Sequence, residues 1–273
     1  MSRHHAARSL PGTLLWRTHV EARALWVRIL VQVPDPEALC LMPDHLHLLH
    51  VRDVSGPLGL AMNAYARWLN PRRGRRGAVW RPQDTPTDVI GGQKRRRSVR
   101  YVHLNPCRAR LVDDPLAWPW STHRDRVGLA WPGVVRRSPD PHGFHRYVSS
   151  DPTVHVQGTE LPLALSLVEP GAAGLECLRG ATSEILRLPL QATEVRGRAR
   201  TVWLRAARCL SPASTAQIAA HCGLTARAIR GVDRSWAQDL SALARAAGDP
   251  RFPGLAPGDL RWDPRWARYR WRD

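Results

Sequence analysis

The chain has 273 residues, of which 43% are hydrophobic, a composition that fits a folded protein and excludes general disorder. No apolar run approaches the ~20 residues of a membrane span, and the five cysteines lack the paired spacing of a disulfide framework or a cysteine zinc site. The net charge is +18, from 41 basic and 23 acidic residues. We expect a cytoplasmic protein, since the first residues contain no apolar stretch like a secretion signal.

The positive charge is carried almost entirely by arginine, because Lys94 is the only lysine. Arginine pairs bidentately with phosphate and stacks on bases, whereas lysine acts as a point charge. The balance therefore favours a nucleic acid as partner. A compositional drift towards arginine is the alternative explanation.

The first half of the chain mixes expected strands with expected helices. Strands are predicted at residues 13–20, 37–42 and 45–51. Helices are predicted at residues 21–33, 58–70 and 93–104. Pro43-Asp44 is a turn pair that joins the last two strands into a hairpin, and the third helix is expected to stop near Asn105 because Pro106 follows. This order predicts an α+β fold, an antiparallel sheet flanked by helices.

The second half is expected to be a separate, mainly helical domain over residues 161–273, reached through a linker rich in Pro, Gly and Ser at 131–160. Residues 214–232 show a helix, a turn at Gly223 and a second helix, the pattern of a helix-turn-helix. Its second helix would carry Arg227 and Arg230 into the major groove. A plain helical hairpin is the alternative. The tail "RWDPRWARYRWRD" (261–273) could stack on nucleic acid or simply be a terminus.

His45 and His47 lie inside the apolar run "LMPDHLHLLH" (41–50). On a strand both imidazoles point to one face and Leu46 points to the other, so the pair can hold one side of a divalent cation. Taken alone, the pair is a weak signal, because chance pairs and core histidines with hydrogen-bond partners are common.

Tyr101 and Asn105 are four residues apart in the expected third helix and therefore share a face. The amide oxygen of Asn105 is a hard ligand that suits Mg²⁺ or Mn²⁺. Tyr101 would place a phenol one turn away. The alternatives are an aromatic ring packed on the sheet and a residue that ends the helix before proline.

Together these segments resemble a known family. "LMPDHLHLLH", followed by "YVHLNPCRARLV" (101–112) and "WPWSTH" (118–123), is similar to the single-tyrosine HUH transposases, in particular the REP-associated tyrosine transposases. The resemblance covers about residues 13–125 and implies a ferredoxin-like HUH endonuclease domain, taken here as residues 1–130. The extension beyond about residue 150 departs from the core family.

The resemblance implies a reaction and a set of roles. Tyr101 would attack a phosphodiester of single-stranded DNA and form a 5′-phosphotyrosine link, with Mg²⁺ or Mn²⁺ held by His45, His47 and Asn105. It also implies a homodimer that recognises hairpins formed by palindromic repeats. The candidates for contacting the hairpin backbone are Arg72, Arg73, Arg75, Arg76, Lys94, Arg95, Arg96 and Arg97. A solvated basic face is the alternative for these residues.

Two rival functions remain open. The chain would be a non-cutting DNA-binding regulator if the helix-turn-helix binds duplex DNA and the first domain only reads hairpins. A metal-dependent hydrolase built on the histidine pair is disfavoured, because the sequence shows no further Asp and His cluster with metal-ligand spacing.

Overall fold

The structure is a computed structural model that describes residues 1–130, 133, 135–158, 160–161 and 174–232, together with 242, 243, 246 and 249. Contacts divide the chain into two compact units. The first is formed by Met1–Gly128 and Gly133–Leu161, and the second mainly by residues 174–232. The tail at 261–273 lies outside the described residues. Within the described part, no helix has the length and apolar character that crossing a membrane requires.

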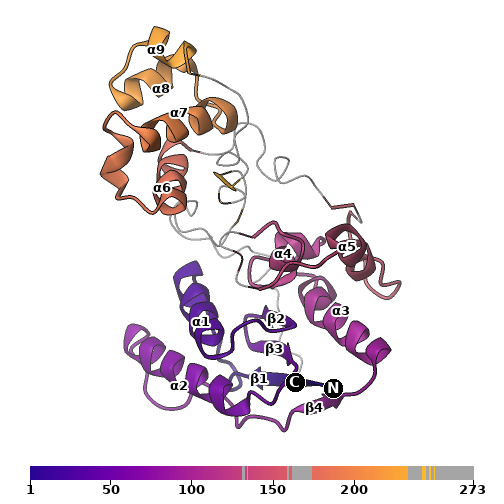
Figure 1. Cartoon of the computed structure of the whole chain (residues 1–273). Coiled ribbons are helices and arrows are strands. Elements are labelled where there is room, and N and C mark those ends of the chain that lie inside the picture. The colour runs from indigo at the N-terminus through magenta and orange to yellow at the C-terminus, as the bar shows by residue number, and fades with distance from the viewer. Residues whose placement is uncertain are drawn as a thin grey trace. The chain divides into compact units, whose positions relative to one another are not determined.

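The first unit is built around a four-stranded sheet in the order β2-β3-β1-β4, in which each neighbouring pair is antiparallel (Figure 1). The strands are β1 (Ser2–Arg8), β2 (Ala38–Leu41), β3 (His45–His50) and β4 (Thr87–Val89). The helices are α1 (His19–Gln32), α2 (Ser55–Arg72), α3 (Gly92–Arg108), α4 (His123–Arg126) and α5 (Pro141–Ser149). From β1 to β4 the elements follow the β-α-β-β-α-β order of ferredoxin-like units.

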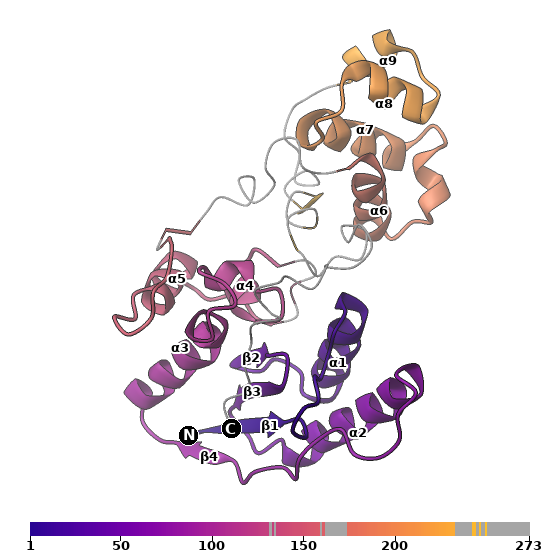
Figure 2. The same cartoon turned by 180° about the vertical axis from the view of Figure 1, so that it is seen from behind.

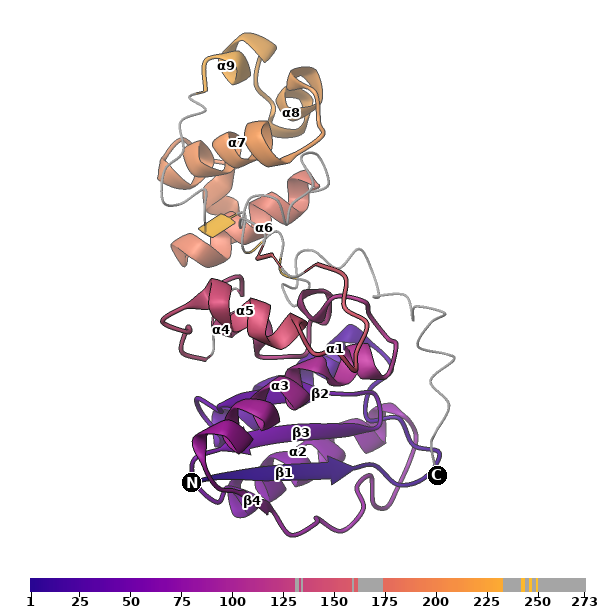
Figure 3. The same cartoon turned by 90° about the vertical axis from the view of Figure 1, so that its right-hand side faces the viewer.

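The sheet has a helix layer on each face (Figure 3). Helices α1 and α2 pack against each other on one face, and α3 contacts β2 and β3 on the other. Leu46 and Leu48 are fully buried on the α1–α2 side, because side chains alternate along β3. The prediction of an α+β fold with helices flanking an antiparallel sheet is confirmed.

The first strand lies earlier than the sequence predicts. Residues 13–20 were expected to form it, whereas β1 spans Ser2–Arg8 and β4 is a further strand that the prediction lacks. The apolar side chains of Leu15 and Trp16 are buried from a loop, not from a strand, and the Leu15 N–H donates to the carbonyl of Pro43. An apolar run marks burial, and strand pairing requires a partner edge that local sequence does not reveal.

Helix α3 continues past Asn105 to Arg108, with Pro106 inside its last turn. Proline removes one N–H donor, but the next bond is still made, from the Ala109 N–H to the Asn105 carbonyl at 3.0 Å. The expected end at Asn105 is therefore wrong by one turn. Asn105 lies within the helix, on the same rigid element as Tyr101.

The stretch expected to be a linker, residues 131–160, contains α5. Pro141 begins this helix and the Asp140 carboxylate caps it by accepting the Gly143 N–H at 2.8 Å. Helix α5 packs on α3, and its Val148 is part of the core of the first unit. The domain that carries the histidine pair thus extends beyond residue 130.

The second unit is helical in its described part (Figure 2). Its helices are α6 (Leu175–Leu186), α7 (Arg198–Leu210), α8 (Thr215–Cys222) and α9 (Ala226–Arg230). Ser214 caps α8, Gly223 ends it with φ +63°, and Ile218 and Ile229 are buried in the core of this unit. The two helices lie where the sequence predicts them, while their use as a DNA-binding helix-turn-helix stays a prediction.

Candidate functional site

His45 and His47 lie next to each other on β3 with both rings on the α3 face of the sheet. Their ring centroids are 4.9 Å apart, and the residues are 8% and 5% exposed. Strand β3 lies between β2 and β1, so the pair is held by hydrogen-bonded neighbours on both sides. This setting holds the two imidazoles in a fixed relation to each other.

Tyr101 reaches the histidine pair from α3. Its ring centroid lies 5.4 Å from that of His47, yet the residue is 40% exposed. The guanidinium of Arg108 lies 5.5 Å from the centre of the phenol ring. The site therefore combines two buried imidazoles with a phenol that remains open to solution, all within one chain.

Asn105 follows Tyr101 by one helical turn and is buried, with 8% of its surface exposed. Its side-chain Nδ2 is shielded from solvent and has no hydrogen-bond partner. A buried amide without partners costs free energy unless something else satisfies it. The amide group is therefore the one site side chain whose hydrogen bonding the described protein atoms leave incomplete.

His4 belongs to the same cluster, although the sequence prediction did not include it. Strand β1 pairs with β3 so that Ala6 faces His47, which places His4 on the same face two residues away. The His4 Nε2 lies 3.1 Å from the His47 Nδ1, and the two rings stack with centroids 5.0 Å apart. The segment "SRHHAAR" lacks the apolar alternation by which strands are found, so no signal pointed to it.

Asp44 orients the other imidazole. Its Oδ1 lies 2.6 Å from the His45 Nδ1, an arrangement that leaves Nε2 as the ring nitrogen for a ligand role. Carboxylates commonly hold metal-binding histidines in this way. The sequence offered a signal, because Asp44 directly precedes His45.

His47 and His4 are biased towards their neutral forms. Burial lowers the pKa of His47 well below its usual range, and the positive charges that His45 and His4 would carry act in the same direction. Burial also lowers the pKa of His4. His47 is therefore neutral at pH 7, the form that binds a cation.

The residues present fit a divalent cation on their donor chemistry. Each of His45 and His47 has one ring nitrogen engaged by a neighbour, which leaves the other for a metal. In the Asn105 amide the oxygen is the atom that could bind a cation, since the unpartnered Nδ2 is an N–H donor. Among the described residues no group of three or more His, Cys, Asp or Glu is placed to hold a metal. Any metal here would depend on a mixed set of two imidazoles and one amide oxygen.

Asp151 is a further acidic residue near the phenol. It accepts a hydrogen bond from Arg108 at 2.9 Å and forms an ion pair with Arg100 at 3.4 Å. Both arginines belong to α3, so Asp151 ties the segment after α5 to the helix that carries Tyr101. Asp151 falls in the stretch 131–160 that the sequence predicts to be a linker.

Arg73 does not fit its predicted role as a DNA contact. Its guanidinium forms an ion pair with Glu21 at 2.8 Å and donates to the carbonyl of Leu14 at 2.6 Å. Its side chain is 7% exposed. Among the predicted DNA contacts at residues 72–76, Arg73 therefore stabilises the fold by joining the end of α2 to the start of α1.

The other basic candidates differ in the contacts that they make within the protein and in their exposure to solvent. Arg75 bonds to the hydroxyl of Thr13, Lys94 donates to the carbonyl of Asp88, and Arg95 pairs with Glu37. The candidates exposed to solvent are Arg72, Arg76, Lys94, Arg95, Arg96, Arg97, Arg227 and Arg230. Their binding to DNA stays a prediction.

Comparison with known proteins gives one structural likeness. No family model and no curated protein matches the chain. The solved structure of a REP-associated tyrosine transposase bound to a REP hairpin is similar over 49% of this chain and 81% of that chain, with 16% sequence identity and a TM-score of 0.40. Likeness at this level carries no conclusion about activity.

Proposed function

We propose that the chain is a transposase-like endonuclease and strand transferase for single-stranded DNA, and that Tyr101 forms a 5′-phosphotyrosine intermediate. The observation that carries the proposal is the position of an exposed phenol 5.4 Å, ring to ring, from His47 in a buried imidazole pair. A phenol used only for packing has no need of solvent access.

The remaining tyrosines of the described residues do not fit this role. Tyr65 is buried, its hydroxyl donates to the Leu15 carbonyl at 2.5 Å, and burial raises its pKa further above the usual range. Tyr147 lies against Arg96 and Arg100. Tyr101 is the tyrosine with a ring contact to the histidine pair.

The proposed reaction balances without a further reactant. The Tyr101 oxygen attacks the phosphorus, the bond to the 3′ oxygen breaks, and the strand leaves with a free 3′-hydroxyl that takes up a proton. The phenol proton passes to solvent or to a neighbouring imidazole. Because a covalent intermediate retains the energy of the phosphodiester, a 3′-hydroxyl can reverse the attack and join strands.

The protein's own residues supply orientation and charge. The Arg108 guanidinium lies beside the phenol ring and places a positive charge next to the attacking group. His45, His47 and Asn105 would hold Mg²⁺ or Mn²⁺, and such a cation polarises a phosphoryl oxygen and offsets the charge that develops during attack. Because His45 and His47 lie on β3 and Tyr101 and Asn105 lie on α3, two packed regular elements fix how these side chains lie relative to one another.

DNA binding in this proposal comes from the exposed arginines, which supply affinity and salt dependence but not sequence choice. The recognised substrate would be a hairpin formed by a palindromic repeat, and the working form a homodimer, as the family resemblance implies. Because the residues named for chemistry all come from one chain, a dimer would carry two complete sites.

The test is a covalent adduct. The purified full chain is incubated with 5′- and 3′-labelled single-stranded DNA that contains a hairpin, with Mn²⁺, and resolved under denaturing conditions. We expect a slowly migrating protein–DNA species that carries the label on the 3′ side of the cut. Tyr101→Phe should abolish it, whereas Tyr65→Phe should not change the chemistry of the folded fraction.

The proposal fails if adducts form equally in Tyr101→Phe, or if none forms across hairpin substrates while the protein binds them. In the second case the remaining candidate is the non-cutting regulator. The observation in its favour is the pair α8 and α9, with Arg227 and Arg230 exposed on the second helix. Duplex binding that is lost in the Arg227→Ala/Arg230→Ala double variant would support it.

A further inference from the structure

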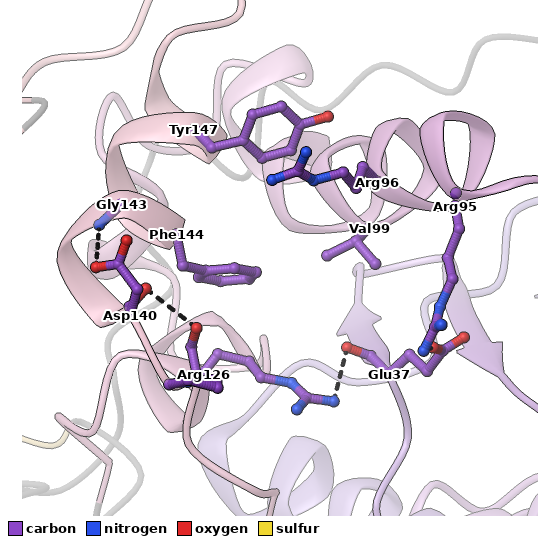
Figure 4. A pocket seen from close by; sticks show the side chains of 12 residues that line it. Glu37, Arg95, Arg96, Val99, Arg126, Asp140, Gly143, Phe144 and Tyr147 are labelled. Carbon is purple, nitrogen blue, oxygen red and sulfur yellow. Dashed lines mark hydrogen bonds and ion pairs between the residues drawn. The ribbon is translucent and has the colours of Figure 1, made fainter.

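A pocket of about 670 Å³ lies within the first unit, between α3, α5 and the segment that leads into β2 (Figure 4). Its volume is within the range of pockets that hold small organic ligands. It is separate from the histidine cluster, since neither His45, His47 nor Tyr101 lines it. Nothing in the proposed cleavage step uses it.

One wall of the pocket is apolar and aromatic. Phe144 and Tyr147 come from α5 and Val99 comes from α3, and all three are only half-buried. Figure 4 shows the Phe144 ring directed into the pocket between the two helices. Flat, partly exposed rings are the surfaces on which unpaired bases stack.

Arg96 supplies a positive charge that can pair with a phosphate group. It is exposed, its guanidinium lies 5.7 Å from the centre of the Tyr147 ring, and it forms no ion pair with another described residue. The neighbouring Arg126 is different, because its guanidinium donates to the carbonyls of Pro36 and Glu37 at 2.9 and 3.1 Å. Arg96 is thus a guanidinium at the pocket that has no acidic partner among the described residues.

Glu37 adds a carboxylate of which one oxygen lacks a hydrogen-bond partner. One oxygen of its carboxylate pairs with Arg95, while the other, Oε2, is shielded from solvent without a hydrogen bond. Its side chain is 10% exposed. Arg95 itself is half-exposed, and pairs of this kind are held weakly enough for the guanidinium to move to a phosphate. The carboxylate would then accept from a ligand that carries N–H groups.

We propose that this pocket receives one unpaired base of the DNA strand, stacked on Tyr147 and Phe144, with its phosphate on Arg96 and an exocyclic amino group donating to Glu37. The inference deepens the proposed function and rests on it for the identity of the strand. It predicts a preference for adenine, cytosine or guanine over thymine, because thymine presents carbonyl oxygens on both sides of its single N–H.

The pocket and the phenol are both bordered by α3. Arg96 and Tyr101 are five residues apart on this helix, about 7.5 Å along its axis but about 140° apart around it. Arg96 therefore lies against Tyr147 while Tyr101 lies against His47. Arg100, next to Tyr101 in the chain, lies 4.9 Å from the Tyr147 ring centre.

The test measures binding without cleavage. Full-length protein carrying Tyr101→Phe is titrated in EDTA against fluorescein-labelled twelve-residue oligo(dT), and against the same strand with one central adenine, cytosine or guanine, by fluorescence anisotropy. We expect each amino-bearing base to bind several-fold more tightly than thymine. Adding Tyr147→Ala should weaken the binding of these strands at least about fivefold, since one stacked base is worth that much or more.

Matched variants separate the pocket from general charge. Tyr147→Phe keeps the stacking ring and should bind like the parent. Arg96→Ala should weaken binding more than Arg146→Ala, which also removes one exposed guanidinium but lies outside the pocket lining. Glu37→Gln offers an amide in place of the carboxylate and should erase the disadvantage of thymine. Thermal unfolding of each variant confirms that it is folded.

Three results would overturn the inference: equal binding of all four strands, unchanged binding in Tyr147→Ala, or displacement of the strand by free dAMP at equimolar concentration, which would assign the pocket to free nucleotides. The adduct assay is read separately. Adducts together with unchanged binding in Tyr147→Ala reject the pocket and retain the cleavage proposal. Tyr147-dependent binding without adducts rejects cleavage and retains the pocket.

Discussion

The first unit contains two clusters of histidines that differ in what surrounds them. The sheet cluster is His4, His45 and His47, on strands β1 and β3 beside Tyr101. The buried chain is His103, His123 and His145, on α3, α4 and α5. In the buried chain, the His123 Nε2 lies 2.9 Å from the His145 Nδ1, and the His103 and His123 rings are 5.2 Å apart.

Both clusters are largely buried, so they differ in the partners of their rings and in the solvent access of the neighbouring residues. The buried chain is closed by Ser121, whose hydroxyl lies 3.0 Å from the His103 Nδ1, and by the ring of Phe144 stacked on His123. The sheet cluster instead borders a carboxylate at Asp44 and a half-exposed phenol. Burial alone therefore does not distinguish the two clusters, whereas an orienting carboxylate together with an exposed neighbour does.

The largest expected effect comes from removing an imidazole of the sheet cluster. His47→Ala should lower the rate of adduct formation about 100-fold or more, because the ligand set for a cation worth several kcal/mol in the transition state is lost. The melting temperature should change little by comparison. Rates are measured by quantifying adducts over time at saturating Mn²⁺.

His50→Ala is the matched control for this prediction. His50 ends the same strand, and its Nδ1 accepts the Arg52 N–H at 3.0 Å. Its removal should leave the adduct rate within about threefold of the parent. Equal losses from His47→Ala and His50→Ala would show that the sheet cluster has no special role.

Removing an imidazole from the buried chain should lower the stability of the protein and leave the adduct rate nearly unchanged. His123→Ala leaves a cavity and deprives His145 of a partner, so we expect a loss of about 2–4 kcal/mol in the free energy of unfolding. The remaining folded protein should form adducts within about threefold of the parent rate. Urea unfolding and adduct rates at low temperature measure the two quantities, and a selective loss of rate would assign the buried chain a chemical role.

Much of the sheet cluster was predictable because its signals are local. Strand alternation places His45 and His47 on one face, and helical spacing places Tyr101 and Asn105 on one face, and the structure places Tyr101 beside His47 as the motif resemblance implied. His4 was not predictable. Its role depends on the pairing of β1 with β3 across more than forty residues, and on a strand that has no apolar pattern.

The same contrast between local and long-range signals explains the errors in the predicted fold. The run at 13–20 is apolar because Leu15 and Trp16 fill the core from a loop, which composition does not distinguish from a strand. The segment that contains α5 is rich in Pro and Gly, yet Pro141 occupies the first turn of a helix, where proline is favoured. Arg73 was counted with its neighbours as a DNA contact, because its partner Glu21 is distant in the sequence.

A smaller effect is expected from the residue that orients His45. Asp44→Asn keeps the size of the side chain but removes the negative charge that supports the Nδ1–H tautomer. The Mn²⁺ concentration for half-maximal adduct formation should rise about 10- to 100-fold, with a nearly normal rate at saturation. Asp53→Asn, an exposed carboxylate that pairs with Arg3 at the edge of the sheet, is the control and should leave this concentration unchanged.

The smallest predicted effect is the change per pH unit in the free energy of unfolding that the buried chain causes. Burial lowers the pKa of His103 to about 3, and the positive charge of Arg126 acts in the same direction. Burial also lowers the pKa of His123 well below its usual range, and that of His145. In the unfolded chain each histidine titrates near pH 6.5. Below that pH the unfolded state binds protons that the folded state does not.

Stability should therefore be fully present above about pH 7.5 and fall as the pH decreases from about 6.5 towards 3, by about 1.4 kcal/mol per pH unit for each such histidine. His103→Asn removes one of these groups, so its plot of unfolding free energy against pH should be shallower by about that amount between pH 6 and 4.5. Urea unfolding in EDTA measures both slopes. Parallel plots would mean that His103 takes up a proton in the folded protein. The buried chain would then be accessible to water, and solvent access would no longer distinguish it from the sheet cluster.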